Sequence, residues 1–340
     1  MNLHQWKHNI RSFNKAAFGE NPVIREQWKN NTIENMHRFS KKNSIWNLEW
    51  KYYKEKEKAM VLVGSSPCLR KDVDKLKELD DNFCIVCANS SLKFLLKHGI
   101  KPHYCIAIDS DHIDIAQHLD CDNKDIILLA STVLSPKALD LWKGSIYFMP
   151  YYSIPNELKP KMRSKLGKVI PSGGNSITQA FWIVSVVFGS HTVIFVGTEY
   201  CFNDVKNYYA DKKTAKQESM ATICPATDVL GRERWTTPGH YNYVIWQERA
   251  CSDLTPPGYF IDTSFGLLGK DCPAIHVMEL SKAIDLVKKA FKDRDRLNKA
   301  KTEKEKIQII KGLIPKHESS QVYHYNVPEH RERILQLARS

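Results

Sequence analysis

The chain has 340 residues, of which 42% are hydrophobic, and carries a formal net charge of +12. This length and composition exclude a disordered chain and predict one large α/β domain with additions, or two domains. No stretch approaches the twenty apolar residues of a membrane-spanning helix, and Met1–Lys7 contains no apolar signal segment. We therefore expect a cytoplasmic protein.

The positive charge is concentrated at two flanks of the sequence. Residues 1–58 contain 12 Lys or Arg against 6 acidic residues, and residues 282–312 contain 11 against 5. Residues 59–281 are nearly neutral, with 23 against 24. Basic flanks suit an acidic partner such as nucleic acid, a phospholipid surface or an anionic glycan. Lysine-rich helices also keep a protein soluble, so the charge alone leaves both interpretations open.

The nine cysteines are an odd number, and Cys84, Cys87 and Cys105 lie within apolar runs. No second pair at zinc-ligand spacing accompanies Cys84-Ile-Val-Cys87. We expect free thiols and no disulfide framework.

The order of apolar runs predicts the fold. Residues 1–50 are aromatic and Asn-rich, and predict a helical lead-in. Strands are predicted at 59–63, 83–88, 104–108, 125–130, 146–149 and 192–196, and helices at 71–79, 91–98 and 175–188. Short apolar strands that alternate with helices are typical of a doubly wound α/β fold with a mostly parallel sheet. Ligands bind such folds at the carboxyl ends of the strands, and polar clusters follow the predicted strands here.

Two later segments differ in pattern. Residues 203–258 are polar and aromatic with little periodicity, which predicts a lid or substrate-binding insertion. Leu280, Ile284, Val287 and Phe291 have helical spacing, so 279–311 predict one or two charged amphipathic helices. The predicted organisation is a basic helical lead-in at 1–58, a nucleotide-binding domain at 59–278, and charged helices with a tail at 279–340.

The most informative motif is Ser172-Gly173-Gly174-Asn175, which an apolar helix follows directly. Two glycines let the backbone approach a ligand closely, and Ser and Asn are good helix caps. The free amides of the next helical turn, at the positive end of the helix dipole, suit a phosphate. The alternative is a glycine-containing turn that Asn175 caps.

Other short motifs narrow the class of nucleotide-binding fold. Gly64-Ser-Ser-Pro67 lacks the Lys of a Walker loop, and no Gly-x-Gly-x-x-Gly accompanies the first strand. The ordered motifs are Gly64-Ser-Ser-Pro-Cys-Leu69, Ala88-Asn-Ser90, Gly99-Ile-Lys-Pro-His-Tyr104 before a strand ending at Asp109, Ser172–Asn175, and Val196-Gly-Thr-Glu-Tyr200.

This order resembles the motility-accessory-factor glycosyltransferases and their 6-hydroxymethylpterin diphosphokinase-like relatives. It is also similar to the bacterial sialyltransferases with a single nucleotide-binding α/β domain. The resemblance covers about 59–285, including Tyr259-Phe-Ile-Asp-Thr-Ser-Phe-Gly266. It implies a Rossmann-like, sialyltransferase-like GT-A variant with helical additions at both ends.

The resemblance also implies site residues. Gly64, Ser65 and Ser66 would approach the ribose and phosphate of the donor nucleotide sugar. Asn89 would bind near its phosphate or sugar, and Asp109 would face the nucleoside. The helix start, with Ser172, Gly173, Gly174 and Asn175, would hold the nucleotide. In the sialyltransferases two tyrosines stabilise the departing phosphate. Tyr208 matches the second of these tyrosines. The position of the first falls on or beside Cys201 in this chain, and Tyr200 is one position away. His240, in Thr237-Pro-Gly-His-Tyr241, is the candidate general base.

The same chemistry follows from the residue types. Glycosyl transfer needs groups that hold the leaving phosphate and a base near the acceptor oxygen, and His is suited to that role near neutral pH. The alternative for His240 is a surface or packing histidine, and for Tyr208 it is loop packing. Asp109-Ser-Asp111 has the form of a carboxylate pair for Mg²⁺ or Mn²⁺, although the sialyltransferase-like relatives work without such a metal.

We therefore expect a glycosyltransferase that uses a CMP- or UDP-sugar and a hydroxyl acceptor on a glycan, protein or modified nucleic acid. One alternative is an ATP- and Mg²⁺-dependent diphosphokinase of a hydroxymethylpterin-like substrate that uses Asp109 and Asp111. A second alternative is a non-catalytic nucleotide or nucleic-acid binding module. The sequence is compatible with an oligomer and does not identify the donor sugar or the acceptor.

Overall fold

The computed structural model describes residues 22–48, 58–151, 154–170, 173–202, 210, 224–254, 258–300, 302 and 305–306. The chain forms two compact units, residues 1–288 and 289–340. The site lies in the first unit. The described part of the second unit contains the end of one long helix.

The first unit is built on an eight-stranded sheet in the order β10-β9-β6-β1-β2-β3-β4-β5, and every neighbouring pair is parallel. The strands are β1 (Ala59–Val63), β2 (Phe83–Ala88), β3 (Tyr104–Ala107), β4 (Ile127–Ser131), β5 (Ile146–Met149), β6 (Thr192–Val196), β9 (Tyr259–Asp262) and β10 (Ile275–Val277). The chain runs outward from β1 to β5 and then returns to place β6 on the other side of β1. This reversal confirms the doubly wound α/β fold that the sequence predicts.

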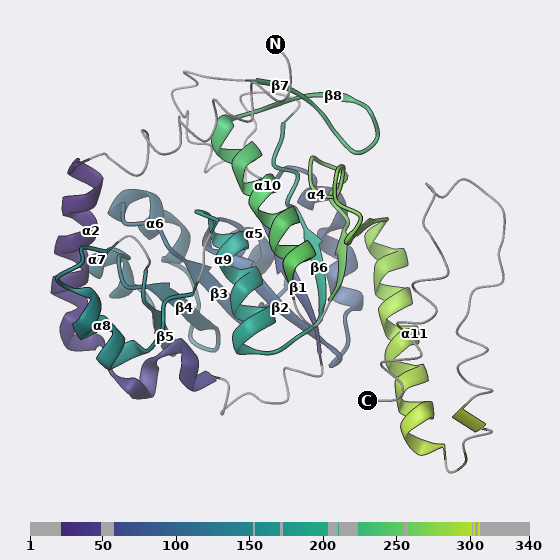
Figure 1. The fold of residues 1–340 in the computed structure, drawn as a ribbon, viewed down its shortest axis with the longest axis horizontal. Coiled ribbons are helices and arrows are strands. Elements are labelled where there is room, and N and C mark those ends of the chain that lie inside the picture. Colours follow the sequence, from purple (N-terminus) through teal and green to yellow (C-terminus); the bar gives the residue numbers. More distant parts are fainter. Residues whose placement is uncertain are drawn as a thin grey trace. The chain divides into compact units, whose positions relative to one another are not determined.

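Helices lie on both faces of the sheet (Figure 1). They are α2 (Pro22–Glu34), η1 (Asn35–Arg38), η2 (Lys41–Asn43), η3 (Ile45–Asn47), α4 (Leu69–Asp72), η5 (Val73–Glu78), α5 (Asn89–Lys97), α6 (His112–Leu119), α7 (Pro136–Leu139), α8 (Lys159–Leu166), α9 (Ser176–Trp182), the π-helical η6 (Ile183–Val187), α10 (Pro238–Asp253) and α11 (Leu280–Lys299). A separate antiparallel hairpin contains β7 (Cys224–Thr227) and β8 (Glu233–Thr236). Among the residues that the structure describes, no helix is long and apolar enough to cross a membrane.

The core fixes the start of α9 at the carboxyl edge of the sheet. Phe181 of α9 is fully buried, and its ring centroid lies 5.3 Å from that of Phe260 in β9 and 6.0 Å from that of Phe195 in β6. Alternate residues of β1, Met60 and Leu62, belong to the same buried cluster. Burying such rings against strand residues stabilises the fold by roughly 1.5–3 kcal/mol per side chain, so α9 is held rigidly over the central strands.

The structure differs from the sequence prediction at several elements. The helix predicted at 71–79 is a short α-turn that continues as 3₁₀ helix, and the helix predicted at 175–188 ends in a π-helical turn. Residues 203–258, predicted as an irregular insertion, contain the β7–β8 hairpin and the 16-residue α10. The polar Gln247 lies between Val244 and Cys251 on the buried face of α10 and interrupts its apolar pattern.

Candidate functional site

The loops after β1 and β6 meet where the strand order reverses. The Gly64 amide donates to the Val196 carbonyl at 2.8 Å, and the Ser66 amide donates to the Gly197 carbonyl at 3.0 Å. A Cβ at Gly64 would lie 2.4 Å from the Gly197 oxygen, so only glycine permits this approach of the two loops. In doubly wound folds ligands bind at this reversal, beside the carboxyl ends of the strands.

Polar side chains from three elements gather beside these loops. Ser90, at the start of α5, donates from Oγ to Ser65 Oγ at 2.9 Å. Ser176, at the start of α9, lies with its Oγ 3.5 Å from Asn89 Oδ1. The first turns of two helices therefore face the same edge as the Ser65 and Asn89 side chains, an arrangement that suits an anion. Both Ser65 and Asn89 are predicted site residues, and the structure brings them into one neighbourhood.

The Gly173-Gly174 turn has a packing role as well. A Cβ at Gly173 would lie 2.6 Å from the Trp246 ring, and one at Gly174, where φ is +101°, would lie 3.0 Å from the Tyr243 ring. Asn175 caps α9, because its side-chain oxygen accepts from the Thr178 amide at 2.8 Å. Both glycines are thus required by the aromatic side chains of α10 that cover them. Ser172, the remaining predicted residue of this turn, lies outside the described residues.

Tyr200 adopts an uncommon backbone conformation for a residue with a bulky side chain, with φ of +54°. Its carbonyl accepts from Thr236 Oγ1 at 2.7 Å, and the preceding Glu199 is held through its amide by Ser66 and through its carbonyl by Leu267. The Tyr200 hydroxyl is buried, and the Asn175 side chain is its polar neighbour. Burial raises the pKa of Tyr200 above its usual value, so the hydroxyl keeps its proton as a donor. Backbone strain that neighbouring hydrogen bonds maintain is characteristic of functional positions.

His240 lies in the first turn of α10, beside Tyr200. Its amide donates to the capping Thr237 Oγ1 at 3.2 Å. Its ring centroid lies 6.3 Å from that of Tyr200 and 6.1 Å from that of Tyr243. Burial lowers the pKa of His240 to about 4, so its imidazole is neutral at pH 7 and able to accept a proton.

The structure thus brings together the predicted residues Tyr200, His240 and Gly174. The rings of Tyr200 and His240 are neighbours, and the Tyr243 ring lies beside His240 and over Gly174. The Asn175 side chain also lies beside Tyr200. Tyr208, the other predicted tyrosine, lies outside the described residues.

The Asp109-Ser-Asp111 segment follows β3 and is braced by α2. The Asp111 amide donates to Asp109 Oδ1 at 3.2 Å, and both aspartates are exposed. Gln27 and Asn31 of α2 each donate to the Ser110 carbonyl at 3.1 Å. Across the residues that the structure describes, no group of three or more His, Cys, Asp or Glu side chains could hold a metal ion.

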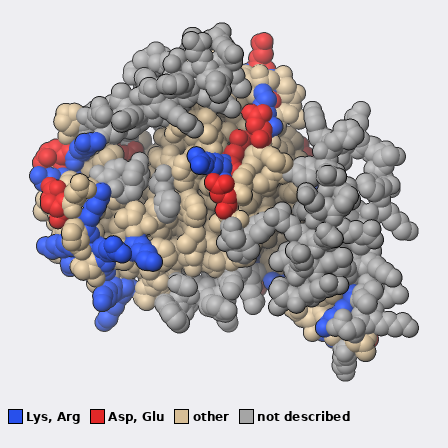
Figure 2. Space-filling view, viewed as in Figure 1, with Lys and Arg blue, Asp and Glu red and all other residues tan. Residues whose placement is uncertain are grey.

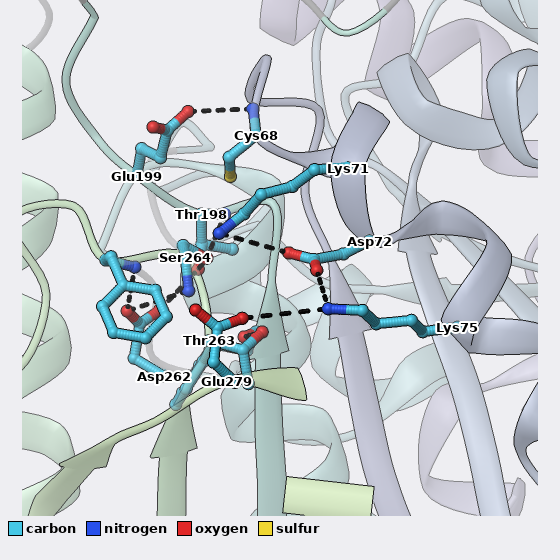
Figure 3. Close-up of polar contacts among 12 residues, drawn as sticks. Cys68, Lys71, Asp72, Lys75, Thr198, Glu199, Asp262, Thr263, Ser264 and Glu279 are labelled. Carbon is cyan, nitrogen blue, oxygen red and sulfur yellow. Dashed lines mark hydrogen bonds and ion pairs between the residues drawn. The ribbon is translucent and has the colours of Figure 1, made fainter. Parts of the chain in front are cut away.

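Asp262 is a buried carboxyl at the end of β9 (Figure 3). The sequence alone assigned it no role. Asp262 is fully buried and accepts from the Ser264 and Phe265 amides at 3.1 Å and from Thr198 Oγ1 at 3.3 Å. Ser264 Oγ in turn accepts from the Thr198 amide at 2.9 Å. Burial raises the pKa of Asp262 to about 7. The network joins the β9 loop to the β6 loop that carries Tyr200.

A separate group of ion pairs lies at the helix after β1 (Figure 3). Buried Asp72 lies 2.9 Å from the Lys75 ammonium, which is also 3.8 Å from Glu279. The Lys71 ammonium lies 5.1 Å from the centre of the Phe265 ring, which places a cation over the loop after β9. The only signal for the Asp262 network in the sequence was the position of Asp262 after an apolar run.

The β7–β8 hairpin is held by a buried aspartate and two arginines. Asp228 Oδ2 accepts from Arg232 Nε at 2.7 Å and Arg234 Nε at 2.8 Å. Burial alone would raise the pKa of Asp228, but the hydrogen bond from the Arg232 amide, together with those from the two arginine side chains, lowers it. The Val229 amide donates to the Gly266 carbonyl at 2.9 Å, so the hairpin docks on the loop after β9.

The parallel sheet, with polar loops gathered where its strand order reverses, defines a Rossmann-like α/β protein. Residues 30–205, more than half of the chain, match the family described as 6-hydroxymethylpterin diphosphokinase MptE-like. The chain therefore belongs to this family, which confirms the family resemblance predicted from the motifs. No curated protein sequence matches the chain.

A solved structure, the MAf glycosyltransferase from Magnetospirillum magneticum AMB-1, has a similar fold. The TM-score is 0.53 at 12% sequence identity, and the match covers 73% of this chain. This chain spans only 41% of the length of that protein. At this identity the likeness shows a shared fold.

Proposed function

We propose that the protein is a glycosyltransferase that moves a sugar from a nucleotide-activated donor, such as a CMP- or UDP-sugar, to a hydroxyl acceptor. The observation that carries this proposal is the placement of a neutral His240 beside the ring of Tyr200 and the ring of Tyr243, which covers Gly174 before α9. A transferase needs a proton acceptor near the attacking hydroxyl and donors near the leaving phosphate.

The donor phosphate would lie between Ser65 and Asn89 on one side and the start of α9 on the other. Gly64 and Ser66 would approach the ribose and phosphate, and Ser172, Gly173, Gly174 and Asn175 would hold the nucleotide at the start of the helix. Tyr200 would donate its buried hydroxyl proton to a phosphate oxygen, and Tyr208 would be the second tyrosine. Asp109 would face the nucleoside.

In the transfer step the acceptor oxygen forms a bond to the anomeric carbon while the bond from that carbon to the phosphate oxygen breaks. The electron pair leaves with the nucleotide, and His240 takes the acceptor proton. A single displacement of this kind inverts the anomeric carbon. A phosphate bound nearby favours the protonated imidazole, so binding of the donor would raise the His240 pKa from about 4 toward neutrality.

A second candidate is a diphosphokinase that moves pyrophosphate from ATP to a hydroxymethyl group. The description of the matching family favours it, together with the exposed Asp109 and Asp111 after β3. These two carboxylates would hold Mg²⁺ against the ATP phosphates. A non-catalytic module that binds a nucleotide or nucleic acid is the third candidate.

A thermal-shift panel distinguishes these candidates. CMP, UDP, GDP and ATP, with their common sugar conjugates, would each be added with Mg²⁺ and with a chelator. A ligand that binds only the folded protein raises its melting temperature according to affinity and concentration. The proposal predicts a shift with CMP or UDP that survives chelation. A shift confined to ATP with Mg²⁺ would instead support the diphosphokinase, and no shift would refute both enzymes.

Substitution of the proposed base then tests the mechanism. His240→Asn should retain the nucleotide-induced shift and lower transfer by about 10²–10⁴-fold, the usual contribution of general base catalysis. His37→Asn changes an exposed histidine on η1 and serves as the matched control. Equal transfer by both variants would remove His240 from the mechanism.

A further inference from the structure

The fold gathers a cluster of basic side chains that the sequence distributes over two segments. Residues 154–170 lie within the nearly neutral middle of the chain, yet contain five Lys or Arg and the single acidic residue Glu157. The η1–η3 segment, residues 35–48, contains three basic residues and no acidic one. On the face in Figure 2, Lys and Arg gather over the part of the first unit where Figure 1 places α8.

Hydrogen bonds hold the two segments side by side. Ser44 Oγ donates to the Leu166 carbonyl at 2.6 Å, and Lys165 Nζ donates to the Phe39 carbonyl at 3.0 Å. The Trp46 indole N–H donates to the Lys168 carbonyl at 2.7 Å. The short helices η2 and α8 therefore form one continuous surface.

We call this surface the α8 basic patch. Its members are Lys41, Lys42, Lys159, Lys161, Arg163, Lys165 and Lys168. All are exposed except Lys165, which is half-buried. Arg38 is excluded because it pairs with Asp140 at 2.7 Å. Such a group of cations attracts a partner that carries many negative charges.

We propose that the α8 basic patch docks the protein on an anionic phospholipid membrane surface. Six of its seven members are lysines, which act as point charges rather than as planar groups for bidentate recognition. Clusters of four to eight basic residues of this kind bind anionic headgroups by charge. Val169, next to Lys168, is an apolar side chain with 40% exposure, and it can enter the headgroup region.

The aromatic residue in this surface argues against single-stranded nucleic acid as the partner. Binding of single strands relies on rings that are free to stack on bases. The Trp46 ring is half-buried and packs over Gly167, where a Cβ would lie 2.8 Å from Trp46 Cδ1. The indole N–H is already used by the Lys168 carbonyl. Charge and one apolar side chain remain, and these match a lipid surface.

The test is co-sedimentation with vesicles of pure phosphatidylcholine and of phosphatidylcholine mixed with phosphatidylglycerol. The patch variant carries Lys41→Glu, Lys161→Glu and Arg163→Glu. The control variant carries Lys97→Glu, Lys124→Glu and Lys270→Glu, which change exposed lysines elsewhere in the first unit by the same total charge. Melting temperatures of both variants confirm that each is folded. No nucleotide or acceptor is present, so the result is independent of the proposed function.

The proposal predicts that the wild-type protein sediments with the anionic vesicles only, and less so as salt is added. Each cation contributes about a fivefold gain in partitioning, so the loss of three cations alone should weaken binding of the patch variant about 100-fold, and the three added carboxylates should weaken it further. The control should lose much less. Equal losses in the two variants would overturn the proposal, as would an absence of binding to anionic vesicles. Preferential binding of duplex RNA or of an acidic polysaccharide through the patch would also overturn it.

Discussion

Replacing Asp262 by asparagine should remove a defined part of the pH dependence of stability. Burial raises the pKa of this carboxyl from 3.8 to about 7. Between these values the native protein keeps a proton that the unfolded chain releases, so the free energy of unfolding falls as pH rises from about 4 to about 7. The difference between the two pKa values corresponds to about 4 kcal/mol.

About 2.5 kcal/mol of this loss should occur between pH 5 and pH 8. Asp262→Asn keeps the shape of the side chain and cannot ionise. The variant should therefore become more stable relative to the wild-type protein, by about that amount, over the same interval. Urea unfolding of both proteins at pH 5, 6, 7 and 8 measures the effect. A difference in stability that stays constant across these pH values would show that Asp262 does not titrate here, and would refute the reasoning.

Three further substitutions test contacts around the site by urea unfolding. Gly174→Ala should lower the free energy of unfolding by about 2–4 kcal/mol, because Gly174 has φ of +101° and the new Cβ would press on the Tyr243 ring. Gly231→Ala is the control: Gly231 has φ of +78° and open space around it, so this change should cost about 1 kcal/mol. Asn175→Ala removes the cap of α9 and should cost about 1 kcal/mol, while Asn175→Ser should retain most of it. Arg234→Ala deprives the buried Asp228 of a charged partner and should cost about 2 kcal/mol.

The controls decide how these results are interpreted. Equal costs at Gly174 and Gly231 would show that the aromatic cover of the turn is not tightly packed. A loss at Asn175→Ser as large as that at Asn175→Ala would exclude capping as its role. Full stability of Arg234→Ala would show that the remaining hydrogen bonds satisfy Asp228.

The positions of six strands were predictable because these strands are short runs of apolar residues, and burial on both faces of a parallel sheet requires such runs. The strands β9 and β10 were not predicted. Ile275–Val277 is only three residues long and has a central histidine. The helix α10 was also missed, because the polar Gln247 interrupts the short apolar pattern of its buried face.

The candidate site was predictable where a local motif determines the geometry. Asn175 follows a glycine pair and precedes an apolar helix, so its place at the helix start could be expected from the sequence. The aromatic rings over Gly173 and Gly174 come from Tyr243 and Trp246, about seventy residues later. No local pattern predicts such a contact. The burial of Asp262 likewise depends on strands that are distant in the sequence.

The most direct test of the central claim is a crystal structure with the nucleotide that gives the largest thermal shift. The proposed function predicts that the phosphate lies against Ser65, Asn89 and the first turn of α9, within reach of the Tyr200 hydroxyl. The sugar or its acceptor would then lie beside His240. A nucleotide bound at any other edge of the sheet, with Tyr200 and His240 remote from its phosphate, would contradict the proposed function.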